Sequence, residues 1–437
     1  MTESSASIFP ASTSPVYSYD VARIRADFSA LDSGWALFDG PGGTQVPRSV
    51  IAAMVAALEG PLANRGAITA GEQKAERTVV GARQAIADLV NGDPRGVVFG
   101  RSATQLAYDF SRMLSTTWQP GDEIIVTRLD HDSNVRPWIQ AAERVGAVVR
   151  WLDFDPDTSE VSTVAFAELL SPRTTLVAIT AASNLIGTMP PVAELATLAH
   201  AVGALVYVDG VHYTAHATVD VEALGADFFA CSPYKFLGPH LGSITASPAL
   251  LETLMPDKLL PSTNVVPERF EFGTLPYELL AGVEAAVDYL AGLDGSTPDG
   301  APGLPSRRAR LVSSYAALEE HEVNLRTRLE NGLAELEGIT VHSKARHRTP
   351  TTLITFDRSS AADGYHFLAT QSVAAPASNF YGLEASRRLG LGDVGGLRVG
   401  LAPYTSVEDI DRLLAGLKDF LATTPSPPHP PLVRARK

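Results

Sequence analysis

The chain has 437 residues, a formal net charge of −14 and a hydrophobic fraction of 45%. The length excludes a small stand-alone module, and the acidic balance disfavours nucleic acid or an anionic membrane as a partner, because no basic excess is available to neutralise phosphates. The single cysteine, Cys231, excludes an intramolecular disulfide, and no Cys/His cluster has the spacing of a metal site. We therefore expect a cytoplasmic protein that binds a small molecule and no metal.

The two ends of the chain differ in composition from its middle. Residues 1–19 are rich in Ser, Thr and Pro and lack the basic and apolar segments of a signal peptide. Proline dominates residues 423–437. Both ends are predicted to be disordered or extended. No apolar run approaches the length of a membrane span.

Between about residues 88 and 251, short β-branched runs alternate with helical patterns, which is typical of a parallel sheet covered on both faces. The runs predict strands at 96–99, 123–127, 148–152, 175–180, 205–209 and 228–231, with helices at 105–114 and 192–202 among the intervening segments. A Gly-, Pro- and Ser-rich loop at 292–308 precedes an amphipathic stretch at 311–336, strands at 351–356 and 396–401, and a helix at 406–421. The predicted fold class is α/β, with a small α/β domain at the C-terminal end.

Two segments carry the most informative chemistry. Asp209, in 206–212 (VYVDGVH), ends a buried strand, where ligands bind in open α/β sheets. Lys235, in 231–242 (CSPYKFLGPHLG), lies in a turn after the next strand, and burial would lower its pKa and make it a Schiff-base former. Such a pair suits pyridoxal 5′-phosphate (PLP), because a carboxylate beside the pyridine nitrogen keeps the ring electron-withdrawing. The alternative is a turn-capping aspartate and a solvated lysine.

Two further segments follow predicted strands. Ser102 and Thr104, in 99–105 (FGRSATQ), place hydroxyl groups beside the free N–H groups of a helix's first turn, which together can bind a phosphate. A simple helix N-cap by Ser102 would look the same. His131, in 129–138 (LDHDSNVRPW), could stack its planar ring on a pyridine, or be a histidine hydrogen-bonded in a loop.

With these segments, the chain resembles the cysteine desulfurase-like branch of the class V aminotransferases, which are PLP enzymes of fold type I. The similarity extends from 38–47 (FDGPGGTQVP) to 397–404 (LRVGLAPY). It implies a large domain with a mostly parallel sheet of the seven-stranded type and a homodimer with active sites at the subunit interface. The implied division assigns 20–48 to the small domain and active site, 49–292 to the large PLP-binding domain and 293–422 to the small C-terminal domain.

The resemblance also implies roles for individual residues. Lys235 would hold PLP, Asp209 would pair with the pyridine nitrogen and His131 would stack on the ring, and these three are the expected catalytic residues. Further cofactor contacts would come from Asn184 and His212 beside the phenolic oxygen, from Ser102, Ala103, Thr104, Ser232 and Tyr234 at the phosphate, and from Gly273 and Thr274 of the other subunit. The expected substrate contacts are Thr44, Asn64, Arg65, Asn379 and Arg398. Arg398 would clamp the α-carboxylate, a role suited to its bidentate fork, or else form a surface salt bridge.

One departure from the family pattern concerns the reaction. Desulfurases of this branch need a cysteine in the loop before the arginine strand, and the corresponding residues here, 373–381 (VAAPASNFY), contain none. Cys231 is expected to be a buried apolar side chain at a strand end. We therefore expect no persulfide-forming desulfuration, and small residues in this loop, Ala374, Ala375, Ala377 and Ser378, would leave room for a bulky substrate side chain.

Several reactions remain open for the same residues. The resemblance favours a C–S lyase that eliminates the sulfur group of a cysteine S-conjugate, with a role in natural-product or antibiotic biosynthesis. The alternatives are transamination or epimerisation of an amino acid, and oxidative deamination coupled to decarboxylation. A regulator without catalysis is disfavoured by the complete set of expected catalytic residues.

Overall fold

The computed structural model describes residues 19–295 and 305–423. Apart from residues 19 and 423, the two ends that we expect to be disordered or extended lie outside this range. Helices are α1 (Val21–Ala26), α2 (Arg48–Glu59), α3 (Ala70–Val90), α4 (Ala103–Leu114), α5 (Arg136–Val145), α6 (Thr163–Leu169), α7 (Val192–Ala201), α8 (Pro248–Glu252), α9 (Tyr277–Leu290), α10 (Arg307–Ala334), α11 (Ala361–Thr370), α12 (Leu383–Arg388) and α13 (Val407–Thr423).

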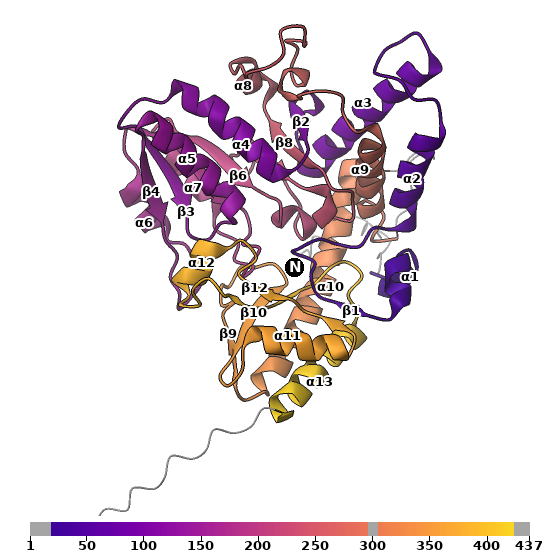
Figure 1. Cartoon of the computed structure of the whole chain (residues 1–437), viewed down its shortest axis with the longest axis vertical. Helices are drawn as coiled ribbons and strands as arrows, with labels where there is room; N and C mark the ends of the chain where they lie inside the picture. The colour runs from indigo at the N-terminus through magenta and orange to yellow at the C-terminus, as the bar shows by residue number, and fades with distance from the viewer. Residues whose placement is uncertain (1–18, 296–304, 424–437) are drawn as a thin grey trace, which may run out of the picture.

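A seven-stranded sheet forms the centre of the larger part of the chain (Figure 1). Its order is β2-β8-β7-β6-β5-β3-β4, and only β8 runs in the opposite direction to the other strands of this sheet. The strands are β2 (Val97–Gly100), β3 (Glu123–Thr127), β4 (Val148–Leu152), β5 (Thr174–Thr180), β6 (Leu205–Asp209), β7 (Phe228–Cys231) and β8 (Gly242–Ala246). The fold is therefore α/β with a mostly parallel seven-stranded sheet, as predicted.

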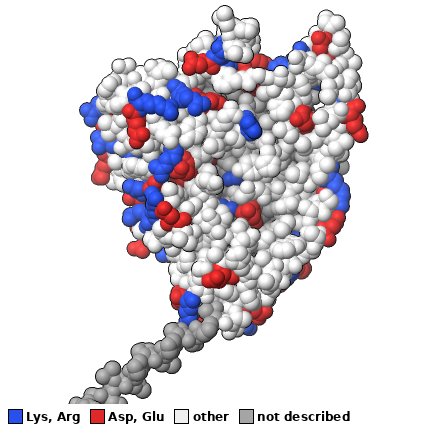
Figure 2. Space-filling view, in the orientation of Figure 1, with Lys and Arg blue, Asp and Glu red and all other residues white. Residues whose placement is uncertain are grey.

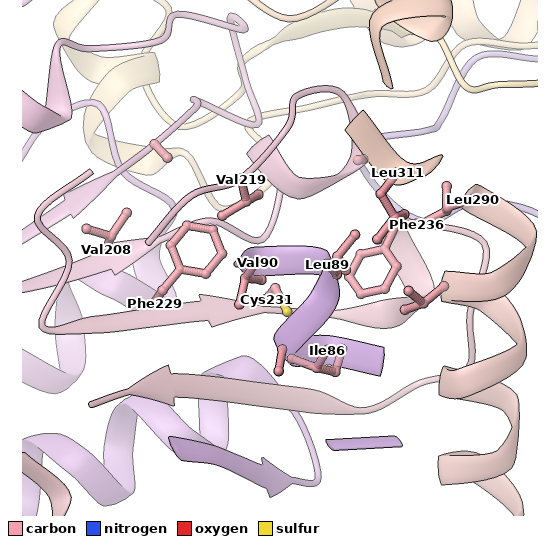
Figure 3. Packing of buried hydrophobic residues seen from close by; sticks show 14 of the residues in the cluster. Ile86, Leu89, Val90, Val208, Val219, Phe229, Cys231, Phe236, Leu290 and Leu311 are labelled. Atoms are coloured by element: carbon pink, nitrogen blue, oxygen red, sulfur yellow. The ribbon is translucent and has the colours of Figure 1, made fainter. Parts of the chain in front are cut away.

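Helices cover both faces of this sheet, so successive strand residues enter different clusters. Val206 and Val208 of β6 pack in the cluster that contains residues of α3, α7 and α9, whereas Tyr207 packs with residues of α4 and α5. This alternation explains why the strand sequences are apolar throughout. Figure 3 shows the first cluster at close range, with Phe229 and Cys231 of β7 near the C-terminal end of α3.

A second sheet is formed mainly by the C-terminal part of the chain. It has the antiparallel order β12 (Ala377–Ser378), β13 (Gly396–Gly400), β10 (Thr351–Phe356) and β9 (Ile339–Val341). Near it, β1 (Ala36–Leu37) pairs in parallel with β11 (Val373–Ala374), and Asp39 forms a bridge with Gly400. This pairing supports the proposed assignment of residues 20–48 to the small domain, because it joins the N-terminal segment to the C-terminal part (Figure 1).

Several predicted bounds agree with the structure and others do not. The strands predicted at 123–127, 148–152, 205–209, 228–231 and 351–356 have these bounds, whereas β2 begins one residue later than predicted. The loop predicted to extend to residue 308 ends earlier, because the Ser306 hydroxyl accepts the Ala309 N–H and caps α10. The antiparallel strand β8 was not predicted.

Two observations concern the solvent-facing surface. Basic and acidic side chains are intermixed on the face seen in Figure 2, and its described residues form no continuous basic surface. Within residues 19–295 and 305–423, no helix is both long enough and apolar enough to span a bilayer, and no group of three or more His, Cys, Asp or Glu side chains is arranged to hold a metal ion.

Candidate active site

Two adjacent cavities lie where the carboxyl ends of the parallel strands face the second sheet. The inner cavity, of about 60 Å³, is lined in part by Asp209, His212 and Ser232, and the outer cavity, of about 610 Å³, by Asp39, Phe380 and Arg398. The two share six lining residues, namely Thr104, His131, Ser133, Asn184, Tyr234 and Lys235. Many of the predicted site residues, which lie far apart in the sequence, are thus brought together.

Lys235 lies in a single 3₁₀ turn directly after β7, and its side chain is buried. Burial lowers the pKa of its amine to about 8, although the nearby Asp209 carboxylate acts in the opposite direction. The Thr44 hydroxyl donates to the Tyr234 carbonyl at 3.1 Å and accepts the Leu237 N–H at 2.8 Å. Thr44 does not line either cavity, and its observed contacts fix the turn that carries the lysine.

Asp209 is the last residue of β6, and its carboxylate lines the inner cavity. Burial raises its pKa, while the Val211 N–H, which donates to Oδ1 at 2.9 Å, acts against the rise. A second buried carboxyl, Asp130, accepts a hydrogen bond from the Asn134 amide at 2.7 Å, and burial raises its pKa to about 8. A cation or a protonated ring nitrogen in the inner cavity would be stabilised by Asp209.

The His131 ring is held as a neutral imidazole. Its Nδ1 accepts the Ser133 N–H at 3.1 Å, so the proton of the neutral ring is placed on Nε2. Burial, followed by the positive charges of Lys235 and Arg398, lowers its pKa to about 3. A flat uncharged ring beside Lys235 is suited to covering one face of an aromatic ligand.

The start of α4 offers donors for an anion. Ser102 is the N-cap of this helix, and its hydroxyl accepts the Gln105 N–H at 3.1 Å. The N–H groups of Ala103 and Thr104 belong to the first turn, which has no intrahelical acceptors for them. Gly242 permits close packing here, because a Cβ at this position would lie 2.3 Å from both Ala103 N and Ser102 C. This geometry is compatible with both roles expected for Ser102, that of a helix cap and that of a phosphate contact.

Asn184 and His212 present buried polar atoms to the inner cavity. The Asn184 amide nitrogen donates to the Phe380 carbonyl at 2.9 Å, and the His212 Nε2 lies 3.0 Å from the hydroxyls of Thr349 and Thr351. Asn184 Oδ1 and His212 Nδ1 have no hydrogen-bond partner among the described residues. Burial keeps the pKa of His212 well below its usual value, so this ring is also neutral. These atoms fit the polar substituent of a bound aromatic group such as PLP.

Arg398, on β13, is buried, so it does not form the surface salt bridge considered as its alternative role. Its Nη1 donates to the Asn184 carbonyl at 3.0 Å, its Nη2 lies 2.5 Å from Asp39 Oδ1, and its guanidinium lies over the Phe380 ring at 3.6 Å from the centroid. Burial lowers its pKa, and Asp39 opposes this effect. The guanidinium still lines the outer cavity, where it could meet a carboxylate.

Some expected residues are not brought to the cavities of this single chain. Gly273, Thr274, Asn64, Arg65 and Asn379 line neither cavity. Arg65 pairs with the carboxylates of Glu76 at 2.7 Å and Glu268 at 2.9 Å, and the Asn379 amide donates to the Asp393 carbonyl at 2.8 Å.

Conversely, sequence reasoning did not single out Tyr108, Arg136, Phe380, Tyr381 and Asp39, which line the outer cavity. Asp39 lies in a segment that carries the family resemblance and Phe380 in the loop that departs from it, so their positions, but not their contacts, were within reach of the sequence.

The fold and the cavity together define the class of enzyme. A seven-stranded, mostly parallel sheet with a buried lysine, a strand-end carboxylate and a donor-rich helix start describes a fold-type I enzyme that uses PLP. The chain belongs to the class-V aminotransferase family, whose model matches residues 36–297 and 309–413.

Three relatives match the chain over nearly its whole length. The chain is 33% identical over 405 residues to an uncharacterized protein of Mycobacterium tuberculosis, covering 91% of this chain and 98% of the relative. It is 29% identical over 421 residues to an aminotransferase-like protein of Gibberella zeae, covering 92% and 99%, and 30% identical over 412 residues to a probable cysteine desulfurase of Pseudomonas aeruginosa, covering 90% and 96%.

The fold is shared with a solved cysteine desulfurase. The enzyme CsdA of Escherichia coli superposes with a TM-score of 0.80 at 26% identity, covering 93% of this chain and 99% of the other. The cysteine desulfurase of Thermococcus onnurineus gives a TM-score of 0.81 at 22% identity, covering 92% and 98%.

Proposed function

We propose that this PLP-dependent enzyme is a lyase that removes the sulfur substituent from the β-carbon of a cysteine S-conjugate. The observation that carries the proposal is the composition of the loop at 373–381. It contributes Ser378 and Phe380 to the outer cavity and contains no thiol, although a desulfurase needs a nucleophilic cysteine there. Cys231 cannot replace it, because it is 0% exposed and burial raises its pKa to about 12.

The side chains around the inner cavity suit the chemistry of such an elimination. When bound, PLP supplies an electron sink for the bond that breaks at the substrate α-carbon. Lys235 can take the α-proton near neutral pH, since its pKa is lowered to about 8. Asp209 would hold a proton at the ring nitrogen, and Arg398 would bind the α-carboxylate. The products are a thiol, pyruvate and ammonium, with one water consumed.

The size of the outer cavity supports a substrate larger than cysteine. The cofactor and the substrate would share about 610 Å³, a volume within the range usual for sites of small organic ligands, and Tyr108, Phe380 and Tyr381 give the cavity aromatic walls. On this basis we extend the proposal to S-conjugates with a bulky substituent, of the kind handled in natural-product biosynthesis.

A product analysis tests the reaction and separates it from the alternatives. Purified holoenzyme is incubated with a panel of S-substituted cysteines, with and without oxygen, and the Lys235→Ala variant serves as the control. Elimination gives equal amounts of pyruvate and thiol in both atmospheres. Carbon dioxide release with oxygen consumption would indicate oxidative decarboxylation, while a keto acid that retains the sulfur substituent, or the D-amino acid, would indicate transamination or epimerisation. Free cysteine as the best substrate would contradict the bulky-conjugate proposal.

We also propose that the enzyme works as a homodimer with active sites at the subunit interface, as is typical of the family. Large apolar side chains are exposed on α2 and on the segment before Gly273, namely Ile51, Val55, Leu58, Leu259, Leu260 and Phe272. Asn64, Arg65, Gly273 and Thr274 lie in or next to the same segments. A second copy would cover these apolar side chains and could bring those four residues to the neighbouring cavity.

A further inference from the structure

The guanidinium of Arg398 already has an anionic partner inside the chain. Asp39 Oδ1 lies 2.5 Å from Nη2, and the two side chains differ sharply in exposure, 47% for Asp39 against 1% for Arg398. The residues around Asp39 in the sequence do not predict this ion pair. A buried guanidinium without a counter-charge is costly, so Asp39 stabilises the arginine while the site is empty.

The loop after Asp39 is built to let its carboxylate reach the arginine. Gly42 N–H donates to the Asp39 carbonyl at 2.9 Å and closes a tight turn. A Cβ at Gly42 would lie 2.4 Å from Asp39 Oδ2 and 2.5 Å from Oδ1. A side chain at this position would therefore collide with the carboxylate, and glycine leaves the space that the carboxylate occupies.

The remaining donors of Arg398 leave little room for a second anion. Nη1 donates to the Asn184 carbonyl at 3.0 Å, and Nε is buried without a partner among the described residues. Phe380 covers one face of the guanidinium. Both Asp39 and Arg398 line the outer cavity, so an incoming carboxylate reaches Arg398 at the position where Asp39 is bound.

We propose that Asp39 competes with the substrate α-carboxylate for Arg398 and so sets the affinity of the site for amino acids. The proposal rests on the carboxylate-binding role of Arg398 in the proposed function. A ligand with an α-carboxylate must displace Asp39, which can turn towards solvent because it is half-exposed. An amine without a carboxylate leaves the Asp39–Arg398 pair in place. Asp39 thus lowers the affinity for every amino acid and keeps the arginine neutralised between turnovers.

Two small ligands that differ only in the carboxylate test the competition. L-alanine and ethylamine both carry an amine and lack a sulfur leaving group, so neither can undergo the proposed elimination. Their binding to the holoenzyme is measured by the change in the visible absorbance of the bound cofactor. The variants are Asp39→Asn, which removes the charge at constant shape, and Gly42→Ala, which pushes the carboxylate away from Arg398. Asp32→Asn, in an exposed ion pair with Arg48, is the control.

If Asp39 competes with the ligand carboxylate, removing its charge or moving it away must strengthen the binding of L-alanine. Asp39→Asn and Gly42→Ala should bind L-alanine about three- to tenfold more tightly than the wild type, with ethylamine binding unchanged. Weaker binding of L-alanine by Asp39→Asn would overturn the proposal, because Asp39 would then position Arg398. An equal change for both ligands would also overturn it.

Arg398→Met, which removes the positive charge at similar length, separates this proposal from the one on which it rests. This variant should lose the preference for L-alanine over ethylamine. If it keeps that preference, Arg398 does not bind the carboxylate, and both proposals fail at this point. If it loses the preference while Asp39→Asn binds L-alanine no more tightly, only the competition fails. The products formed from S-substituted cysteines remain an independent measurement of the elimination.

Discussion

Cys231 and Lys235 are four residues apart, yet the fold places their reactive atoms in opposite environments. Cys231 points into the apolar cluster between the large sheet and α3, where its Sγ lies 3.1 Å from the Ser243 hydroxyl (Figure 3). Lys235 follows in the turn after β7 and reaches the cavities. The thiol is therefore inert at neutral pH, as predicted from its position, while the amine is available for chemistry.

The pKa of Lys235 leads to a prediction for cofactor loading. Burial disfavours the charged ammonium and lowers the pKa from 10.5 to about 8, so the neutral amine predominates above that pH. We expect cofactor-free protein to react with PLP at a rate that rises with pH and levels off above about 8. The appearance of the visible absorbance band measures this rate. Lys235→Ala should show no such band, and a rate still rising at pH 10 would contradict the lowered pKa.

Because His131 is neutral, we predict that it does not control the pH dependence of the reaction rate. With a pKa lowered to about 3, the ring does not change its charge between about pH 5 and pH 8. The His131→Phe variant should therefore have a lower rate and weaker cofactor binding but a pH–rate profile of the wild-type shape in this interval. Loss of a wild-type inflection in the variant would show that His131 titrates there.

Individual site residues were predictable to the extent that local sequence fixes them. Asp209 ends a predicted strand and Lys235 lies in the turn after another, so their place at the carboxyl edge of the sheet could be inferred. The pairing of Arg398 with Asp39 joins residues 359 positions apart through the second sheet and the N-terminal segment. No local pattern encodes that contact, because it depends on how the two ends of the chain pack.

At the scale of elements, Thr44 connects the N-terminal segment to the lysine turn. Thr44→Val would remove the hydroxyl that accepts the Leu237 N–H and leave this donor without that partner, at a cost of about 1–3 kcal/mol. We expect a lower melting temperature and slower cofactor loading. Thr44→Ser keeps the hydroxyl and should behave like the wild type in both measurements. A loss in Thr44→Ser without a loss in Thr44→Val would instead indicate that the methyl group, and not the hydrogen bonds, is important.

The close approach of β8 to the start of α4 gives a second prediction at this scale. In Gly242→Ala, the new methyl group would meet backbone atoms of Ser102 and Ala103, which cannot move independently of the helix. We expect a loss of about 1–3 kcal/mol in unfolding free energy, as is usual for overpacking. PLP should also stabilise this variant less than the wild type in thermal unfolding.

Gly282→Ala is the matched control, because the atoms nearest to a methyl group there belong to the side chains of Met54 and Pro239 and not to the backbone. It should retain the full stabilisation by PLP. A similar reduction in both variants would show that the effect is not specific to the helix start.

Elements were predictable where burial leaves a strong pattern. The strands β3, β5, β6 and β7 are covered on both faces and rich in β-branched or aromatic residues, which the sequence shows directly. The strand β8 escaped prediction because its sequence, GSITA, contains mostly small residues. Its antiparallel direction depends on pairing with both β2 and β7, and such non-local pairing is not visible in a single segment.

At the scale of the whole molecule, both ends of the chain contribute to one site. The large sheet supplies Lys235 and Asp209, the second sheet supplies Arg398, and the N-terminal segment supplies Asp39 and the Thr44 clamp (Figure 1). The cavity between the sheets therefore forms only when the N-terminal segment packs against both. This arrangement makes ligand binding sensitive to changes far from the cofactor.

The exposed apolar residues on α2 and near Gly273 yield the last prediction. Leu260 is 97% exposed, and a charge there would be stranded in the interface if a second copy covers it. We expect Leu260→Asp to shift the protein from dimer to monomer in analytical ultracentrifugation. PLP affinity should fall along with dimerisation, because Gly273 and Thr274 line neither cavity of their own chain and could contact the phosphate only in the partner.

The control is Val164→Asp, at an exposed position on α6, where an acidic residue suits the first turn of the helix. It should remain dimeric and bind PLP normally. A monomeric Leu260→Asp variant with unchanged PLP affinity would show that each chain completes its own cofactor site. Conversely, if the two properties fall together, mixing inactive Lys235→Ala with inactive Thr274→Ala should restore activity, because one of the two sites in a mixed dimer would then contain only wild-type residues at both positions.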